Sequence, residues 1–224
     1  MTHFVPRLDG QPFAAPLGKI VCVGRNYAAH AQELNNPLPD APLLFIKPAS
    51  AVVPLEQPFA LPRDCGSVHH ELELAVLIGA PLSNVKADAV APAIAGIGLA
   101  LDLTLRDVQD QLKKDGHPWE RAKAFDGAYP VSGFLSPSGI ALQSLTLQLW
   151  RNGRLQQDGH TSQMLFPIAA LIAEISGNFS LQAGDIVSTG TPAGVGPLQG
   201  GDALVLTLGQ KQAEDLLRVE TTVL

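Results

Sequence analysis

The sequence predicts a mostly β fold with a few helices, of the α+β class, as a single domain over residues 1–224. The 18 prolines and 21 glycines are spread along the chain and separate short apolar runs, a pattern typical of many short strands joined by turns. Hydrophobic residues make up 46% of the chain, which is ample for a folded core. Helical patterns are fewer, and neither G-x-G-x-x-G after a strand nor G-x-x-x-x-G-K-[ST] occurs, so nucleotide-binding folds have no support.

Short apolar or alternating runs bounded by turn residues give the predicted strands. These cover residues 19–23, 43–46, 71–78, 94–103, 145–151, 185–188 and 203–208. Asn152-Gly153 follows an alternating run and predicts a type I′ hairpin turn, with a return strand through Leu155. The predicted helices cover residues 28–34, 104–114 and 164–175.

Charge, cysteine content and hydropathy exclude several classes of partner. The formal net charge of −6 and the scattered Lys and Arg residues give no basic surface for a phosphate backbone, so we expect no nucleic-acid partner. Cys22 and Cys65 are too few for a disulfide scaffold or a thiolate metal site and fit a reducing compartment. The chain starts without the apolar core of a signal peptide, and its longest uncharged apolar run, 89–101, is shorter than the ~20 residues of a membrane span. We therefore expect a soluble cytoplasmic protein without a membrane partner.

An acidic pair lies at the start of a predicted buried strand. Glu71 and Glu73 share a strand face with His69, because successive side chains point to opposite faces, while His70 takes the other face. The apolar run at 75–78 that follows is typical of a strand covered on both sides. Two carboxylates side by side at such a place are costly without a cation.

A third carboxylate, Asp102, ends the apolar run at 94–101 and lies at the edge of another predicted core strand. Three carboxylates completed by waters suit Mg²⁺ or Mn²⁺, whereas Zn²⁺ recruits more nitrogen or sulfur ligands. The alternative is that Glu71 and Glu73 form a solvated strand face and that Asp102 caps the following helix.

Arg106 and Gln109 follow Asp102 at helical spacing and predict one wall of the same site. Arg106 can grip a carboxylate in bidentate fashion, and Gln109 offers both a donor and an acceptor. The alternative for both residues is an ordinary exposed helix face.

His30 and Glu33 lie three residues apart in a predicted helix, close enough for the carboxylate to orient the imidazole. Such a pair can act as a general base towards water. A chance surface pair is the alternative.

Lys123 and the glycine-rich stretch 188–197 are further candidates. Lys123 lies among small and aromatic residues rather than in a charged run, so it either neutralises an anionic substrate or serves as a snorkelling structural lysine. In the stretch 188–197, Thr189 and Thr191 offer hydroxyls and backbone amides to an anion, or the stretch is a tight connection between strands.

Six segments of the chain, taken in order, closely resemble the fumarylacetoacetate hydrolase family. They are V-G-R-N-Y-A-A-H-A-Q-E-L, L-L-F-I-K-P, H-H-E-L-E-L-A-V, A-L-D-L-T-L-R-D-V-Q, W-E-R-A-K-A-F-D and T-G-T-P-A-G-V-G, and they lie within residues 20–196. The length looks like that of the short, single-domain members related to acylpyruvases and oxaloacetate decarboxylases. The resemblance implies a mixed β-sandwich roll, a homodimer and a pocket that contains Mg²⁺, with Mn²⁺ as an alternative.

Residue by residue, the resemblance implies roles for the matching positions. It implies that Glu71, Glu73 and Asp102 are the metal ligands and that His30, Glu33 and Lys123 are catalytic. It implies substrate-binding roles for Arg25, Lys47, Arg106, Gln109 and Thr191. It further implies that the segment bearing His30 and Glu33 acts as a lid, and residues 35–39 would suit a mobile connection after it.

The predicted function is Mg²⁺-dependent hydrolysis of the C–C bond of a 3-acylpyruvate, such as acetylpyruvate or fumarylpyruvate, to pyruvate and a carboxylic acid. The carboxylate and 2-oxo group of such a substrate can chelate the metal, and His30 would deprotonate the attacking water. The same site could decarboxylate oxaloacetate. One alternative is an isomerase or decarboxylase of an aromatic ring-cleavage oxo-diacid. Another is a non-catalytic metal-dependent binder of oxo-acids, against which the His30–Glu33 pair argues because binding needs no general base.

Overall fold

The computed structural model describes residues 4–34, 37–210 and 215–224, and within these ranges the chain is mostly β with a few helices. The strands are β1 (Arg7–Leu8), β2 (Gln11–Pro12), β3 (Ile20–Gly24), β4 (Leu43–Lys47), β5 (Val52–Pro54), β6 (Val68–His70), β7 (Leu72–Ile78), β8 (Ile94–Leu101), β9 (Thr104–Leu105), β10 (Tyr129–Val131), β11 (Leu145–Arg151), β12 (Arg154–His160), β13 (Ile186–Ser188), β14 (Gly196–Pro197), β15 (Ala203–Gln210) and β16 (Asp215–Thr222). The α-helices are α1 (Ala28–Glu33), α2 (Arg106–Asp115), α3 (Glu120–Lys123) and α4 (Ile168–Asn178). Short 3₁₀ turns lie at η1 (Ala49–Ala51), η2 (Ala87–Ala89), η3 (Ala91–Ala93), η4 (Leu142–Ser144) and η5 (Thr161–Gln163).

A seven-stranded mixed sheet forms the centre of the molecule, with strand order β4-β3-β13-β7-β8-β10-β5. The β3–β13 and β5–β10 pairs are parallel, and the other neighbours are antiparallel. Every residue of β7 is buried, as its continuous apolar run predicts for a strand covered on both faces. The two faces of β7 contact different parts of the molecule, because alternate side chains point to opposite sides.

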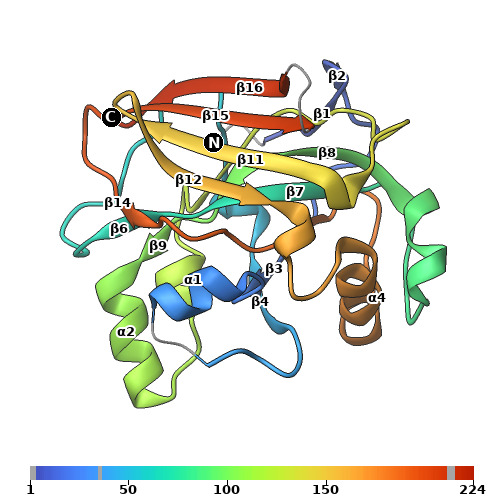
Figure 1. Ribbon diagram of the computed structural model, residues 1–224, viewed down its shortest axis with the longest axis horizontal. Coiled ribbons are helices and arrows are strands. Elements are labelled where there is room, and N and C mark those ends of the chain that lie inside the picture. The colour runs from blue at the N-terminus through green and yellow to red at the C-terminus, as the bar shows by residue number, and fades with distance from the viewer. Residues whose placement is uncertain (1–3, 35–36, 211–214) are drawn as a thin grey trace.

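A four-stranded antiparallel sheet, β12-β11-β15-β16, covers one face of the seven-stranded sheet. Figure 1 shows its strands across the upper part of the view, with α1, α2 and α4 in the lower part. Leu74 and Val76 of β7 share one buried cluster with Leu147 of β11 and Leu206 of β15. The opposite face of β7 belongs to a second cluster that includes Ala75. Glu73 alternates with these residues and points to the side of Ala75, so the acidic pair faces away from the four-stranded sheet.

A small three-stranded sheet, β14-β6-β9, lies beside the start of β7 and joins segments that are distant in sequence. His69 of β6 pairs with Thr104 of β9 on one side and with Pro197 of β14 on the other. The chain therefore breaks its strand at Glu71, between β6 and β7, where the prediction placed one strand over 71–78. None of the helices in the described ranges has the length and hydropathy of a membrane span.

The predicted hairpin turn is confirmed, and several element boundaries differ from the prediction. Asn152 and Gly153 both have positive φ, 51° and 75°, as a type I′ turn requires. The return strand β12 runs to His160 rather than ending at Leu155, because it pairs with β11 along most of its length. The predicted helix over 104–114 begins at Arg106, because Thr104 pairs in β9.

The third predicted helix and the last strand also differ. Pro167 is the N-cap of α4, so the helix begins at Ile168 rather than at 164, and it continues to Asn178. Strand β16 was not predicted, because its central residues Arg218 and Glu220 interrupt the apolar run on an edge strand. Of the predicted mobile connection over 35–39, residues 35 and 36 lie outside the described ranges.

Candidate active site

Three buried carboxylates come together at the ends of β7 and β8. Carboxylate oxygens of Glu71, Glu73 and Asp102 lie within 4.8 Å of one another, and these residues are 5%, 1% and 1% exposed. The register of β7 on β8, with Leu72 opposite Leu101, brings the three together, and the Asp102 N–H donates to the Glu71 carbonyl at 2.9 Å. The alternative of a solvated strand face is therefore wrong. Asp102 does not cap the helix either, because the N-cap of α2 is Leu105.

Lys123 and Arg106 neutralise part of this cluster. Nζ of Lys123 donates to Glu71 Oε2 at 2.9 Å, to Asp102 Oδ2 at 2.7 Å and to Thr104 Oγ1 at 2.7 Å. Nη2 of Arg106 donates to Glu71 Oε1 at 2.5 Å. Lys123 is 3% exposed, so it is a buried cation of the site and not a snorkelling surface lysine.

Lys47 lies behind Asp102, and it is fully buried. Its Nζ donates to the backbone carbonyls of Leu103, Lys123 and Ala128, and it lies 2.8 Å from Oδ1 of Asp102. An ammonium group has three protons, so those carbonyls use them all. Lys47 is also absent from the lining of the cavity described below, which places its charge under Asp102 rather than in contact with that space.

The two glutamates differ in pKa because their neighbours differ. Burial, followed by the charge of Asp102, raises the pKa of Glu73 to about 8, although Ser188 Oγ and the Gly190 N–H donate to its Oε2 at 2.5 and 2.8 Å. Burial acts in the same direction on Glu71, but Lys123 and Arg106 outweigh it and hold the pKa of Glu71 below its usual range. Glu73 therefore carries a proton at neutral pH unless another cation compensates it.

These residues fit a hard divalent cation. The donor set contains carboxylate oxygens, which Mg²⁺ and Mn²⁺ prefer. Asp102 Oδ1 accepts no hydrogen bond from any residue in the described ranges, and the Lys47 ammonium lies 2.8 Å from it as an ion-pair partner. The Lys123 ammonium bridges Glu71 and Asp102, so a cation already stands between two of the three carboxylates. A carboxyl with a raised pKa and the two ammonium groups that flank Asp102 indicate a site built for positive charge.

A cavity of about 400 Å³, including its open mouth, lies above the acidic cluster. Its polar lining consists of Arg25, His30, Glu71, Glu73, Asp102, Arg106, Gln109, Lys113, Lys123 and Thr191. Its apolar lining includes Val23, Leu34, Phe45 and Trp119. The structure thus brings all the predicted site residues except Lys47 and Glu33 to the surface of one cavity, and these two contact residues that line it.

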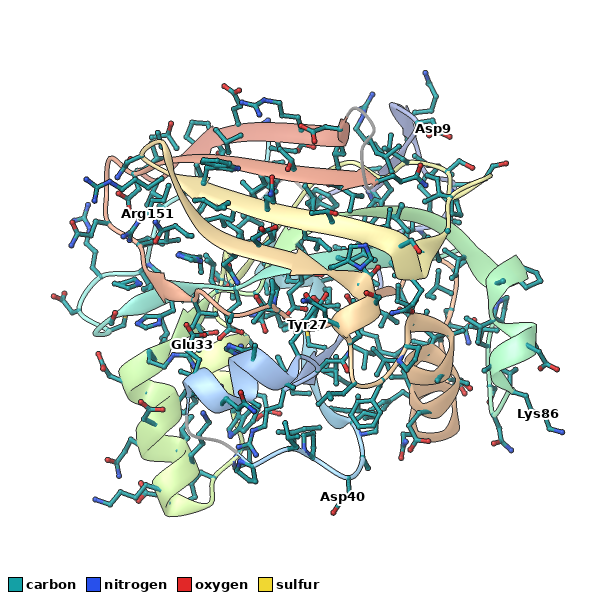
Figure 2. All side chains as sticks on the ribbon, in the orientation of Figure 1. Asp9, Tyr27, Glu33, Asp40, Lys86 and Arg151 are labelled. Carbon is teal, nitrogen blue, oxygen red and sulfur yellow. The ribbon has the colours of Figure 1, made fainter. Side chains whose placement is uncertain are left out.

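His30 on α1 faces the cavity, and Glu33 follows His30 by one helical turn. His30 Nδ1 lies 3.3 Å from Oε2 of Glu33, and the His30 side chain is buried. The backbone N–H of Gly194 donates to both oxygens of Glu33, at 3.0 and 3.2 Å. In Figure 2, Glu33 lies beside α1 near the surface, whereas Tyr27, which precedes this helix, lies in the interior. The His30 imidazole is therefore oriented by the Glu33 carboxylate, which is itself hydrogen-bonded to the loop that contains Gly194.

The loop 188–194 contacts both the acidic cluster, through Glu73, and helix α1, through Glu33. Gly190 has a φ of +92°, and a Cβ there would lie 2.7 Å from Cβ of Asn26, so the position requires glycine. Asn26 Nδ2 donates to the Thr189 carbonyl at 2.8 Å, which attaches the start of α1 to this loop. The Thr189 hydroxyl points away from the cavity and donates to the Leu74 carbonyl, so of the two threonines only Thr191 is among the residues that line it.

Arg106 and Gln109 meet in the first turn of α2, as predicted. Arg106 Nη1 donates to Gln109 Oε1 at 2.6 Å, which leaves the Nε2 amide of Gln109 for another partner. Both residues are buried, so the alternative of an exposed helix face is wrong.

Arg25 and Lys113 add positive charge to the walls of the cavity. Arg25 has a φ of 61°, an uncommon conformation for a residue with a side chain, and such conformations concentrate at functional sites. Burial, followed by the charges of Arg106 and Arg25, lowers the pKa of Lys113, and all three residues line the same cavity.

Sequence reasoning missed three residues of this region. Lys113 follows Gln109 by four residues, so the helical spacing already used for Arg106 could have found it. Ser188 and Gln157 carry no local signal, because each meets its partner only through the pairing of distant strands. Gln157 is fully buried, and its amide contacts both Leu72 and Thr191.

Comparisons with known proteins agree with this geometry. A family model described as fumarylacetoacetate (FAA) hydrolase C-terminal matches residues 19–224. The chain is 55% identical over 194 residues to oxaloacetate tautomerase YcgM of Escherichia coli, which covers 86% of this chain and 89% of that protein. It is 43% identical over 187 residues to the human mitochondrial oxaloacetate tautomerase FAHD1, covering 83% and 84% of the two chains.

Solved structures agree as well. A crystal structure from Oleispira antarctica has a TM-score of 0.95 and 57% identity, and the alignment covers 98% of this chain and 99% of that chain. The structure of fumarylpyruvate hydrolase from Pseudomonas aeruginosa in complex with Mn²⁺ and pyruvate has a TM-score of 0.90 and 31% identity, covering 99% and 95%. From the matching model, the relatives and the shared fold, the chain belongs to the fumarylacetoacetate hydrolase family.

Proposed function

We propose that this protein is a divalent-metal-dependent enzyme that interconverts the keto and enol forms of a small 2-oxo diacid, with oxaloacetate as substrate. The observation that carries the proposal is one cavity with a three-carboxylate cluster at its base and the cations Arg25, Arg106 and Lys113 on its walls. Such walls suit a substrate with two carboxylates. The names of the Escherichia coli and human relatives, both oxaloacetate tautomerases, support the same substrate.

The acidic cluster would hold the cation through Glu71, Glu73 and Asp102. When bound, Mg²⁺ or Mn²⁺ would supply Lewis-acid stabilisation of negative charge on the 2-oxo oxygen. Arg106, Gln109 and Thr191 would bind the adjacent carboxylate, and Arg25 would bind the distal one. Lys47 would act as a positioning residue, because its ammonium holds Asp102 from behind.

His30 and Lys123 would perform the proton transfer. His30, oriented by Glu33, takes a proton from C3 of the keto form. The C2–C3 double bond forms, and the electron pair of the C2 carbonyl moves to its oxygen. The positive charge of Lys123, whose three protons go to Glu71, Asp102 and Thr104, stabilises that oxyanion, and His30 returns the proton to it. The cycle consumes no water and no redox partner.

A second candidate is hydrolysis of a 3-acylpyruvate to pyruvate and a carboxylic acid. The His30–Glu33 pair supports it, because the same base can deprotonate a water that attacks the far carbonyl. The C3–C4 bond then breaks, C4 leaves in the carboxylic acid, and C3 becomes the carbon of the pyruvate enolate, which takes up a proton. The fumarylpyruvate hydrolase with similar structure supports this candidate. Oxaloacetate decarboxylation reaches the same enolate by loss of carbon dioxide.

The test follows three reactions with one preparation. Enol oxaloacetate decay is followed by its absorbance, pyruvate release from oxaloacetate reports decarboxylation, and loss of the acetylpyruvate enol reports hydrolysis. Each is run with Mg²⁺ and with EDTA. The proposal expects EDTA-sensitive acceleration of the first reaction above the other two. A faster third reaction would support the hydrolase, and EDTA-sensitive binding of oxalate without turnover would indicate an oxo-acid binder.

The quaternary structure and the compartment stay predictions. We propose a homodimer from the family resemblance, and light scattering coupled to size-exclusion chromatography tests it.

A further inference from the structure

Gln157, on β12 of the four-stranded sheet, reaches across the interface between the sheets to the far side of the site. Its side chain is fully buried and uses every hydrogen-bonding capacity of the amide. Oε1 accepts from the Leu72 N–H at 2.9 Å and bonds His70 Nδ1 at 3.0 Å. Nε2 donates to Thr191 Oγ1 at 2.8 Å and to the Pro192 carbonyl at 2.9 Å.

Two backbone groups fix the orientation of this amide. The Leu72 N–H can only donate, so the atom facing it must be the oxygen, and the Pro192 carbonyl can only accept, so the atom facing it must be the nitrogen. Since Oε1 is an acceptor, His70 must bond it through a protonated Nδ1. His70 is therefore the Nδ1–H tautomer, and its buried Nε2 has no hydrogen-bond partner within the described ranges.

The same orientation decides what the Thr191 hydroxyl can do. Its oxygen already accepts from Gln157, so its own proton is left to donate. The Pro192 carbonyl lies 3.5 Å from Oγ1, at the limit of a hydrogen bond, and that carbonyl already accepts from Gln157 at 2.9 Å. Thr191 lines the cavity, so a ligand oxygen in the cavity is the better acceptor.

We propose that Gln157 is a positioning residue that sets the Thr191 hydroxyl as a hydrogen-bond donor into the cavity. Its amide also joins Thr191 to the backbone at the start of β7, next to Glu71 and Glu73. Leu72 lies between the two glutamates in sequence, so one amide fixes both the loop that presents Thr191 and the backbone that presents the carboxylates. The inference rests on the proposed function only in that a substrate oxygen is the acceptor of the Thr191 proton.

The first test needs no ligand. A long-range ¹H–¹⁵N spectrum of the ¹⁵N-labelled protein, with His70 assigned by comparison with His70→Gln, reports which ring nitrogen carries the proton. The Nδ1–H tautomer is expected. The Nε2–H tautomer would overturn the proposal, because Gln157 would then have to present its nitrogen to both His70 and Leu72.

The second test is a double-mutant cycle on oxalate binding in Mg²⁺, measured by calorimetry. Thr191→Val should weaken binding by about three- to tenfold, the range of one hydrogen bond, while Thr191→Ser should stay within about twofold. Gln157→Glu places a carboxylate oxygen where the amide donated, so the Thr191 hydroxyl turns to donate to it. This variant should lose as much affinity as Thr191→Val, and combining the two should add almost nothing.

A purely structural role gives a different pattern. Thr191→Val would then weaken oxalate binding by the same factor in both backgrounds. Gln156→Glu makes the same chemical change at the neighbouring half-buried position and should leave binding unchanged. If Gln157→Glu does not fold, unchanged affinity in Thr191→Val alone overturns the proposal. If the unmodified protein binds no oxalate, the proposed function fails, and the His70 tautomer still decides the role of Gln157.

Discussion

Glu33 accepts the backbone N–H of Gly194 with both of its carboxylate oxygens, at 3.0 and 3.2 Å, while its Oε2 lies 3.3 Å from His30 Nδ1. The loop that carries Thr191 therefore also fixes the carboxylate that orients the imidazole. Gly194 has a φ of +95°, and a Cβ there would lie 1.9 Å from the Gln156 carbonyl oxygen, so this close approach requires glycine. The base and the threonine are thus placed by one short segment.

The His30 imidazole should matter more where a proton is abstracted than where carbon dioxide is lost. For His30→Ala we expect the keto–enol conversion and acylpyruvate hydrolysis to fall by about 100-fold or more, the range of general-base catalysis. Oxaloacetate decarboxylation should fall by less than about tenfold, since it needs no base. Steady-state rates on the three reactions check this, with the exposed His117→Ala as a matched control. Equal losses in all three reactions would contradict the division of labour.

Metal affinity should depend on the protonation of Glu73. Burial and then Asp102 raise the pKa of Glu73 to about 8, and a metal ligand must be deprotonated, so the metal competes with this proton. The apparent affinity for Mg²⁺ should rise by up to about tenfold per pH unit below pH 8 and level off above it. Calorimetry in two buffers of different ionisation enthalpy should find close to one proton released near pH 7. A pH-independent affinity would contradict the assignment.

The stability of the metal-free protein should fall as the pH rises from about 5 to 8. The folded pKa of Glu73, about 8, lies above its ordinary value of 4.5, so its contribution is complete below pH 4.5 and is lost as the pH rises through 8. The expected slope is up to about 1.4 kcal/mol per pH unit. Glu71 has the opposite sign, because its pKa is lowered, and its contribution is constant above pH 5.

Urea unfolding in EDTA at pH 5.5, 6.5 and 7.5 measures this slope. Glu73→Gln is the matched variant, because its amide oxygen can still accept from Ser188 and Gly190 while the group no longer titrates. Its pH dependence should be flatter than that of the unmodified protein. If both proteins give the same slope, another group is responsible.

Removal of the Lys47 charge should destabilise the fold more than removal of a surface lysine. Lys47→Met leaves Asp102 without the cation behind it and frees three carbonyls in the interior, so we expect a loss of about 3–5 kcal/mol in the free energy of unfolding. Lys114→Met, at an exposed position of α2, should change it by less than about 0.5 kcal/mol. Denaturant titration of both variants measures the difference, and similar values for the two would show that Lys47 does not support Asp102.

Arg25 should distinguish diacids from monoacids. For Arg25→Gln we expect kcat/KM on oxaloacetate to fall by about tenfold, because one charge-assisted hydrogen bond to the distal carboxylate is lost. The value on acetylpyruvate, which ends in a methyl group, should change by less than about threefold. Lys114→Gln serves as the control for loss of one positive charge outside the cavity. A loss of equal size on both substrates would assign Arg25 to the shared 2-oxo acid end.

The sequence by itself determined the fold class, the buried strands at the centre and most residues of the site. Strand alternation placed Glu71 with Glu73 and set His70 on the opposite side, where it contacts Gln157. Helical spacing placed Arg106 with Gln109. These predictions succeeded because both periodicities are local properties of the backbone.

Only the tertiary structure decided how the site is held. The sequence could not show that Lys47 lies behind Asp102, that Ser188 bonds Glu73, or that Gln157 reaches Thr191. Each of these contacts joins segments far apart in the chain, and each depends on the register between strands and on the packing of one sheet against the other. The break at Glu71 also depends on pairing between distant segments, because β6 pairs with β9 and β14 instead of continuing into β7. Local periodicity cannot encode such pairings, because a buried hydrogen bond is satisfied by whichever distant group the fold brings within reach.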